Sequence, residues 1–77
     1  MKIEILLFGQ LTDLLKTGSI SVEPVDDTNE LNRVLQARYP ALQRARYVMA
    51  VDKQTVTDNV KLSPGSLVAL LPPFSGG

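Results

Sequence analysis

The sequence predicts an α+β fold in which a mixed sheet of five strands packs against one main helix and one short helix. Two continuous apolar stretches, residues 3–8 and 67–71, lie near opposite ends of the 77-residue chain. Such stretches are typical of central strands, and strands this far apart in sequence can pair in parallel. Between them, residues 28–39 carry apolar side chains at helical spacing. This pattern places one helix against a sheet built from both ends of the chain.

The first strand is expected at residues 3–8, where Leu6 and Phe8 break the alternation of polar and apolar residues. An apolar run of this kind predicts a strand that is covered on both faces. Gly9 follows and closes the run. The last apolar stretch, residues 67–71, predicts a second strand covered on both faces, so we expect both strands in the middle of the sheet.

A short helix and a half-buried strand are expected after Gly9. Three leucines recur at the spacing of one helical face, at Leu11, Leu14 and Leu15. Gly18 is placed to end this helix, because glycine readily takes the left-handed conformation that closes a helix. Residues 19–23 then alternate polar and apolar, which predicts a strand that Pro24 stops.

The main helix has recognisable ends. Asp27 and Glu30 have the spacing of a capping box, in which Asp27 accepts a hydrogen bond from an unpaired backbone N–H and Glu30 reaches back. An apolar stripe at helical spacing follows at Leu31, Val34, Leu35 and Tyr39. Pro40 disfavours helical geometry at the residue before it, so the helix should end at Tyr39.

Four arginines lie on or after the main helix, at Arg33, Arg38, Arg44 and Arg46. We interpret them as a solvated face, because arginine side chains are mostly exposed in folded proteins. A docking patch for an acidic partner is the alternative.

The rest of the chain predicts three strands joined by turns. The strands are expected at residues 47–51, 54–57 and 67–71. Turn residues separate them at positions 52–54, 58–59 and 63–65, and we assign Asp52 to the first turn rather than to chemistry. The complete order of elements is that of the β-grasp, or ubiquitin-like, architecture, which we expect over residues 1–71.

The composition excludes several classes of function. The chain has no cysteine and no histidine, which removes disulfides, the usual zinc ligands and the commonest general base. Eight Lys and Arg balance eight Asp and Glu, so no basic footprint for nucleic acid or an anionic membrane is present. No apolar run approaches a membrane helix in length, and Glu4 interrupts what would be a signal peptide. We therefore expect a cytoplasmic protein that binds no metal or cofactor itself.

Residues 72–77, Pro-Pro-Phe-Ser-Gly-Gly, are expected to form an extended tail. Pro72 and Pro73 each fix φ near −65° and lack a backbone donor, so they should end the last strand and project the chain away from the sheet. Phe74 to Gly77 then reach about 13 Å at about 3.3 Å per residue, enough to enter a pocket on another protein. Phe74 could anchor in such a partner or fold back onto its own sheet, and the sequence leaves both open.

The terminal Gly76-Gly77 presents a carboxylate that no side chain obstructs. A free carboxylate is a poor acyl donor and must first be activated, normally by adenylation with ATP. The sequence has no glycine-rich phosphate-binding loop, so a partner enzyme would have to use the ATP. These features favour a carrier over a self-contained catalyst, and an incidental terminus is the alternative.

The end of the chain resembles the closing segment of the small subunits of molybdopterin synthase, a family of β-grasp sulfur carriers. Residues 62–77, LSPGSLVALLPPFSGG, follow the family pattern L-x-x-G-D-E-V-A-hydrophobic-hydrophobic-P-P-V-S-G-G. Residues 7–11 and 50–52 also look like family positions, and the resemblance covers the whole chain. The Pro-Pro-x-Ser-Gly-Gly ending is specific, whereas a plain Gly-Gly is shared with ubiquitin and the thiamine-pathway carriers.

This resemblance implies a particular chemistry for Gly77. Its carboxylate would be adenylated by an enzyme resembling ubiquitin-activating enzymes and converted, with a sulfur donor, to a thiocarboxylate. The tail would insert into the large subunit of the synthase, within a heterotetramer, and deliver sulfur to the pterin precursor in molybdenum cofactor biosynthesis. The catalytic groups would lie on the large subunit. The tail residues that would enter it are Pro72, Pro73, Phe74, Ser75 and Gly76.

Four features depart from the family pattern. Ser66-Leu67 replaces the usual acidic pair, Asp52 replaces Asn, Phe74 replaces Val, and Thr12-Asp13 stands where Arg-Glu is frequent. These changes leave the terminal chemistry intact but alter surfaces that a partner could contact. The alternative functions are a sulfur carrier for thiamine or tRNA thiolation, a ubiquitin-like modifier that forms isopeptide bonds, and a plain interaction domain.

Overall fold

The computed structural model describes residues 2–73 of the chain. The strands are β1 (Ile3–Leu7), β2 (Ser19–Val22), β3 (Val48–Val51), β4 (Gln54–Val56) and β5 (Leu67–Leu71). The helical segments are α1 (Gln10–Leu15), α2 (Thr28–Arg38) and the 3-10 helix η1 (Pro40–Gln43). The tail residues Phe74, Ser75, Gly76 and Gly77 lie outside the described residues, so the site positions expected there remain predictions.

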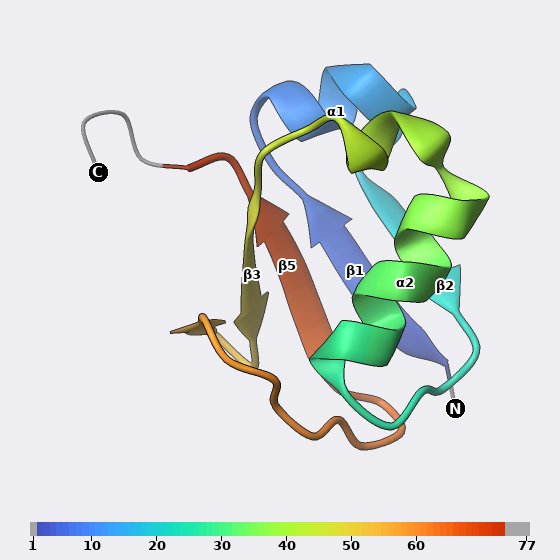
Figure 1. Ribbon diagram of the computed structural model, residues 1–77, viewed down its shortest axis with the longest axis vertical. Helices are drawn as coiled ribbons and strands as arrows, with labels where there is room; N and C mark the ends of the chain where they lie inside the picture. The colour runs from blue at the N-terminus through green and yellow to red at the C-terminus, as the bar shows by residue number, and fades with distance from the viewer. Residues whose placement is uncertain (1, 74–77) are drawn as a thin grey trace.

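The five strands form one mixed sheet in the order β2-β1-β5-β3-β4 (Figure 1). The first and last strands are neighbours and run parallel, with Leu6 opposite Ala69. The remaining neighbouring strands pair antiparallel. The predicted parallel pairing of the two ends of the chain is confirmed, and so is the α+β, β-grasp architecture with one main and one short helix.

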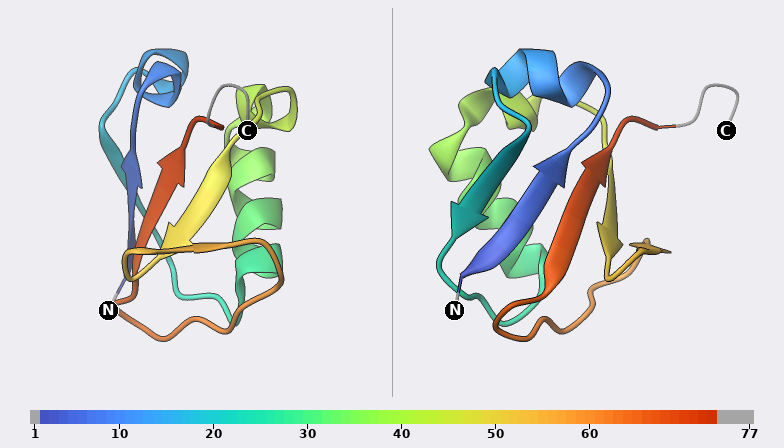
Figure 2. Two further views of the ribbon diagram at one scale, coloured as in Figure 1. Left: turned by 90° about the vertical axis from the view of Figure 1, so that its left-hand side faces the viewer. Right: turned by 180° about the vertical axis from the view of Figure 1, so that it is seen from behind.

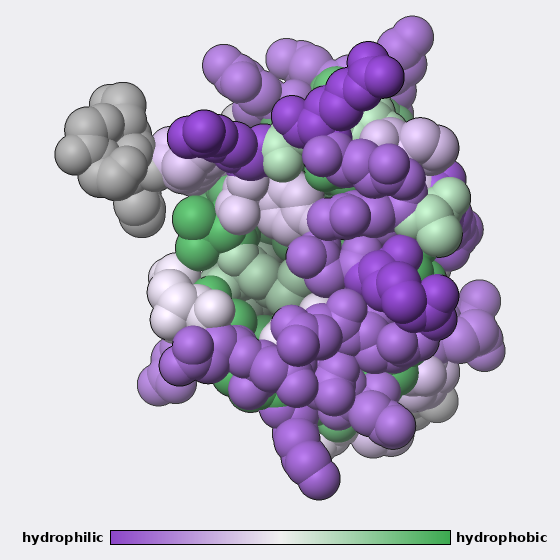
Figure 3. Space-filling view, viewed as in Figure 1, coloured by the Kyte–Doolittle hydropathy of each residue, from purple (hydrophilic) through white to green (hydrophobic). Residues whose placement is uncertain are grey.

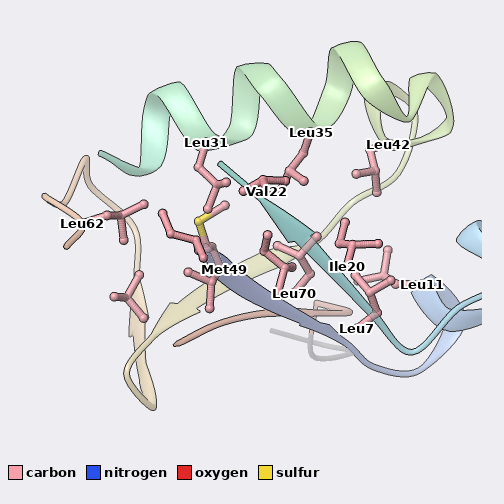
Figure 4. Close-up of a cluster of buried hydrophobic side chains, with 14 residues drawn as sticks. Leu7, Leu11, Ile20, Val22, Leu31, Leu35, Leu42, Met49, Leu62 and Leu70 are labelled. Carbon is pink, nitrogen blue, oxygen red and sulfur yellow. The ribbon is translucent and has the colours of Figure 1, made fainter. Parts of the chain in front are cut away.

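The core lies between α2 and one face of the sheet. Leu31 and Leu35 point from α2 toward the strands, and Leu42 points there from η1 (Figure 4). Like these three leucines, the facing side chains of β1 and β5 are fully buried, at Ile3, Ile5, Val68 and Leu70. Burying one large aliphatic side chain contributes about 1.5–3 kcal/mol. The packing of these residues therefore holds α2 against the two central strands.

The opposite face of the sheet carries no helix among the described residues (Figure 2, right). Along β1, Ile3, Ile5 and Leu7 are buried, whereas Glu4 is exposed and Leu6 is half-buried. Strand β5 alternates in the same way. The prediction that these two strands are covered on both faces was therefore wrong. One long helix covers one face, so the outward apolar residues of the central strands stay partly accessible.

The ends of α2 agree with the prediction in part. Asp27 caps the helix, because its Oδ1 accepts a hydrogen bond from the Glu30 backbone N–H at 2.9 Å, and this bond lowers the pKa of the Asp27 carboxyl. Glu30 does not reach back as expected. Its carboxylate accepts hydrogen bonds from Arg33, which lower the pKa of Glu30. A guanidinium is a stronger donor to a carboxylate than a neutral N–H is. The pair of Glu30 with Arg33 therefore replaces the hydrogen bond that Glu30 was expected to accept from the backbone N–H at the start of the helix. The helix ends before Tyr39, as predicted.

Helix α1 ends earlier than predicted. Lys16, not Gly18, takes the left-handed conformation, with φ 59°, and its N–H donates to the Thr12 carbonyl. Leu11 is 3% exposed, but Leu14 is 43% exposed. The predicted apolar stripe of this helix therefore faces the core only in part, and Leu14 contributes to a surface.

Strands β3 and β4 form a hairpin with a two-residue loop. Val51 pairs with Gln54, and the intervening Asp52 and Lys53 have positive φ values of 49° and 72°. Positive φ at both loop residues is the requirement of a type I′ turn. Asp52 Oδ1 also accepts a hydrogen bond from the Leu67 backbone N–H at 3.1 Å, which ties the hairpin to β5. The assignment of Asp52 to a turn is confirmed.

Candidate functional site

The tail leaves the sheet at the end where α1 lies (Figure 1). Pro72 and Pro73 directly follow Leu71, the last residue of β5, and have no regular secondary structure. Neither proline has an N–H to add to the strand ladder. Within β5, the carbonyl of Leu70 accepts a hydrogen bond from the Phe8 backbone N–H at 3.2 Å. The end of β5 is thus fastened to the end of β1 immediately before the tail begins.

Gly9 provides the space in which Pro72 sits. A Cβ at position 9 would lie 2.7 Å from Pro72 Cγ, closer than carbon atoms approach without displacement. Gly9 also has φ 59° and ψ −135°, close to a region that essentially only glycine adopts. The glycine that the sequence indicated only as the end of a strand therefore also determines where the tail starts. Because a single glycine after a strand is common, nothing in the sequence indicated that Gly9 would contact Pro72.

An apolar strip runs across the uncovered face of the sheet next to the tail. The register places Ala69 beside Leu6, and Leu71 beside Val48. Phe8 follows directly after β1 and is 44% exposed. We define the apolar strip as Leu6, Phe8, Val48, Ala69 and Leu71. Accessible apolar surface of this kind marks a protein interaction site when it is contiguous. The sequence did not predict this strip, because those strands were expected to be covered on both faces.

A pocket of about 350 Å³ lies at the root of the tail. Helix α1 contributes Leu11 and Leu14, the segment after η1 contributes Arg44 and Arg46, and Pro72 and Pro73 complete the wall. The end of β5 passes between α1 and η1 when the sheet is seen along its edge (Figure 2, left). We call this space the tail-root pocket. It brings together three segments that are distant in the sequence.

The four arginines do not form one face. Arg33 pairs with Glu30, and Arg38 donates to the Ser21 carbonyl of β2 at 3.1 Å. Arg44 and Arg46 instead line the tail-root pocket. All four side chains are exposed, as the solvated-face interpretation predicts, but only the last two are next to the candidate site.

A second hollow of about 320 Å³ lies between α2 and strands β3 and β4, and is visible as a recess on the front of the molecule (Figure 3). Three of its polar side chains, Thr28, Asn32 and Tyr47, are already engaged in hydrogen bonds. The Tyr47 hydroxyl donates to Asn32 Oδ1 and accepts from Gln36 Nε2, while the Thr28 hydroxyl donates to Asn59 Oδ1. These bonds connect α2 to the neighbouring segments, so we assign the hollow a structural role.

The described residues that have shifted pKa values lie in the first turns of α2, far from the tail root (Figure 1). Within residues 2–73, no cluster of three or more acidic, histidine or cysteine side chains could hold a metal ion. No helix in the same range has the length and apolar character to span a membrane. What the described chain presents at this end of the sheet is a fixed starting point for the tail and two flanking surfaces.

Comparison with known proteins gives matches along nearly the whole chain. A model of the ThiS family matches residues 5–77. The molybdopterin synthase sulfur carrier subunit of Caenorhabditis briggsae is 34% identical over 83 residues, covering 100% of this chain and 99% of that protein. A chain in the complex of subunits 1 and 2 of the molybdopterin-converting factor from Helicobacter pylori is 26% identical, with a TM-score of 0.75 and 100% of both chains covered.

A chain from Pyrococcus furiosus, named as subunit 1 of a molybdopterin converting factor, shares the fold. Its TM-score is 0.84 at 17% identity, with 96% of this chain and 99% of that chain covered. The resemblance to the small subunit of molybdopterin synthase is confirmed by the full-length relative of that name. The family match begins within β1, includes all of β5 and continues through the tail, and the chain therefore belongs to the ThiS family.

Proposed function

We propose that this chain is the sulfur carrier subunit of molybdopterin synthase and that the carboxylate of Gly77 carries the sulfur as a thiocarboxylate. The observation that carries the proposal is the match, at 34% identity and over 99% of its length, to a molybdopterin synthase sulfur carrier subunit. The Pro-Pro-Phe-Ser-Gly-Gly ending that follows β5 supports the same assignment.

The chemistry of the tail has three steps. A Gly77 carboxylate oxygen attacks the α-phosphorus of ATP on an adenylating partner enzyme, and pyrophosphate leaves. A sulfide-level sulfur from a donor then attacks the carbonyl carbon, the bond to AMP breaks, and AMP leaves with the electron pair. The thiocarboxylate sulfur finally attacks a carbon of the pterin precursor on the large subunit and displaces an oxygen leaving group from that carbon. Water then attacks the Gly77 carbonyl carbon of the resulting thioester, the bond from that carbon to sulfur breaks, and the sulfur stays on the precursor while Gly77 returns to a carboxylate. ATP and the catalytic groups belong to the partners.

The described structure supports this role through the position of the tail root. Strand β5 is central in the sheet, and Pro72 rests against Gly9, so the tail starts from a rigid point. A stiff start lowers the entropy lost when the tail enters a partner. Residues 74–77 reach about 13 Å beyond it. The length suits a buried active site on the large subunit, with Phe74 close to its entrance.

The apolar strip is the surface that we assign to the large subunit. It lies on the uncovered face, next to the point where the tail leaves, and a protein that receives the tail must come close to it. The related Helicobacter pylori chain is found in a complex of subunits 1 and 2 of the molybdopterin-converting factor. Burial of an apolar strip contributes to association in proportion to the area removed from water.

Reconstitution tests the function directly. The chain is combined with the large synthase subunit, the adenylating enzyme, ATP, a sulfur donor and the pterin precursor. Intact-mass measurement should detect replacement of one terminal oxygen by sulfur, and the dithiolene product should form. Deletion of Gly77, or addition of one residue after it, should abolish sulfur transfer without changing thermal stability.

Three outcomes contradict this proposal. Sulfur transfer by either altered terminus would remove Gly77 from the mechanism. A thiocarboxylate that forms but supplies only thiamine or tRNA thiolation would assign the chain to another pathway. Conjugates to many lysines, without product, would indicate a ubiquitin-like modifier.

A further inference from the structure

The tail-root pocket has an apolar floor and a basic rim. Leu11 is 3% exposed and belongs to the core, while Leu14 is 43% exposed at the mouth. Pro72 and Pro73 form the wall on the side of the tail. Arg44 and Arg46 line the pocket from the segment that follows η1. The pocket thus offers an apolar contact and two positive charges within one small space.

The segment that carries the two arginines is held in place. The backbone N–H of Arg44 donates to the Ala41 carbonyl, and that of Ala45 donates to the Leu42 carbonyl, each at 3.3 Å. Leu42 is fully buried, and Ala45 packs against the core. Ala45 lies between the two arginines, so its packing against the core keeps Arg44 and Arg46 beside the tail root.

The two guanidinium groups make no ion pair within the described chain. Within residues 2–73, ion pairs join Lys2 to Glu23 and Arg33 to Glu30, and neither involves Arg44 or Arg46. Asp13, the acidic residue of α1, does not line the pocket. Figure 3 shows strongly hydrophilic side chains on the surface next to the end of the described chain. Among residues 2–73, the two arginines of the pocket are therefore not held in ion pairs and can pair with carboxylates of a partner.

We propose that the tail-root pocket is a docking site for a carboxylate-bearing segment of the large synthase subunit. An apolar side chain of that segment contacts Leu11 and Leu14, and its carboxylates pair with Arg44 and Arg46. The identity of the partner rests on the proposed function. A guanidinium forms two parallel hydrogen bonds to a carboxylate, and such pairs strengthen when a partner excludes water around them.

The position of the pocket is the reason to assign it to the protein that receives the tail. Pro72 and Pro73 belong to both the pocket and the tail, so a partner that encloses the residues after Pro73 must cover the pocket mouth. The apolar strip lies on the uncovered face of the sheet, whereas the pocket lies between α1 and the segment after η1. Contacts at both places would hold the tail root from two sides and set the direction in which the tail enters.

Binding to the purified large subunit, measured by calorimetry at low and high salt, tests the proposal. The test variant is R44Q together with R46Q, and the matched control is R33Q, which removes an exposed arginine that pairs with Glu30. We expect the double variant to bind about tenfold more weakly and with less salt dependence, and the control to bind as the unsubstituted chain does. The double variant should unfold at the normal temperature because both side chains are exposed, and R33Q should unfold close to it because an exposed ion pair contributes little to stability.

The outcomes separate this inference from the proposed function. If the unsubstituted chain does not bind the large subunit, the proposed function fails. If it binds, and the double variant binds equally well, the docking site is refuted while the function stands. A second measurement uses the side-chain NMR signals of Arg44 and Arg46 in the free chain. If deletion of residues 74–77 shifts these signals, the chain's own end occupies the pocket and the proposal is wrong; unchanged signals support it.

Discussion

The contact between Gly9 and Pro72 can be tested by adding one methyl group. In G9A the new Cβ would lie 2.7 Å from Pro72 Cγ and 3.4 Å from Pro72 Cδ. Carbon atoms pack at about 3.5–4.0 Å, so the two groups must separate by about 0.8 Å. The displacement falls on the first residue of the tail, because Gly9 itself is held between β1 and α1.

The expected cost has a backbone part and a steric part. Holding alanine at φ 59° and ψ −135° costs about 1–3 kcal/mol. Alanine also lowers the conformational entropy of the unfolded chain, which offsets about 0.4–1 kcal/mol of this cost. Crowding a packed contact adds about 1–3 kcal/mol. We therefore expect G9A to lower the free energy of unfolding by about 3 kcal/mol, the middle of the range that these parts give together. At about 4–8 °C per kcal/mol, the melting temperature should fall by about 12–24 °C.

Urea unfolding of a double-mutant cycle separates the two parts. P72A removes the Cγ and Cδ atoms that the new methyl group would meet, so G9A should cost about 1 kcal/mol less in that background. The backbone part should remain in both backgrounds. If G9A costs the same with and without Pro72, the steric contact is not what requires glycine. If G9A has no effect in either background, the unusual backbone conformation of Gly9 is also refuted.

Three further predictions follow from the hairpin, the cap of α2 and the apolar strip. K53G should stabilise the chain by about 0.5–1 kcal/mol, because a left-handed lysine costs about 1–2 kcal/mol and glycine loses about 0.5–1 kcal/mol in entropy; urea unfolding measures it. Folding lowers the pKa of the Asp27 carboxyl from 3.8. The ionised carboxylate therefore stabilises the folded chain at pH values above 3.8, and this stabilisation is lost as the pH falls through the lower pKa of the folded state. D27N caps without titrating, so its thermal stability should fall less on acidification. F8S should weaken binding to the large subunit about tenfold and leave folding intact, because Phe8 is 44% exposed.

Each of these predictions has a defined contrary result. A lower stability of K53G would show that Lys53 makes a contact worth more than the strain of its backbone. An unchanged acid profile in D27N would mean that the Asp27 carboxylate does not contribute to the pH dependence. For F8S, V60S serves as a control in the segment between β4 and β5. Equal weakening by both would show a general loss of structure rather than loss of the apolar strip.

Local features of the sequence were sufficient to predict most elements. The Asp27 cap, the end of α2 before Tyr39 and the turn at Asp52 were all expected, and each depends on residues only a few positions apart. The parallel pairing of β1 with β5 was also expected, from two apolar runs too continuous for edge strands. Prediction from local residues was less reliable where two donors compete for one acceptor. The Glu30 carboxylate was expected to accept a hydrogen bond from a backbone N–H, but it pairs with the Arg33 guanidinium instead.

Of the candidate site, only the tail could be predicted from the sequence. The sequence predicted that the chain projects after Leu71, but it could not show what surrounds that point. The strands β1 and β5 looked buried on both faces because an apolar run does not reveal whether a second layer exists, and the apolar strip was missed for that reason. Leu14 was expected in the core by its spacing, and its exposure depends on how α1 is placed on the sheet.

The sequence by itself determined most of the elements, the family resemblance and the ending that makes Gly77 the candidate carrier. Only the tertiary structure decided that Pro72 rests on Gly9, and that Leu14, Arg44 and Arg46 gather around the same tail root. The physical reason is the range of the interactions. Periodicity and capping act within a few residues, whereas these contacts join segments about 30 to 60 positions apart and exist only once β5 has paired with β1.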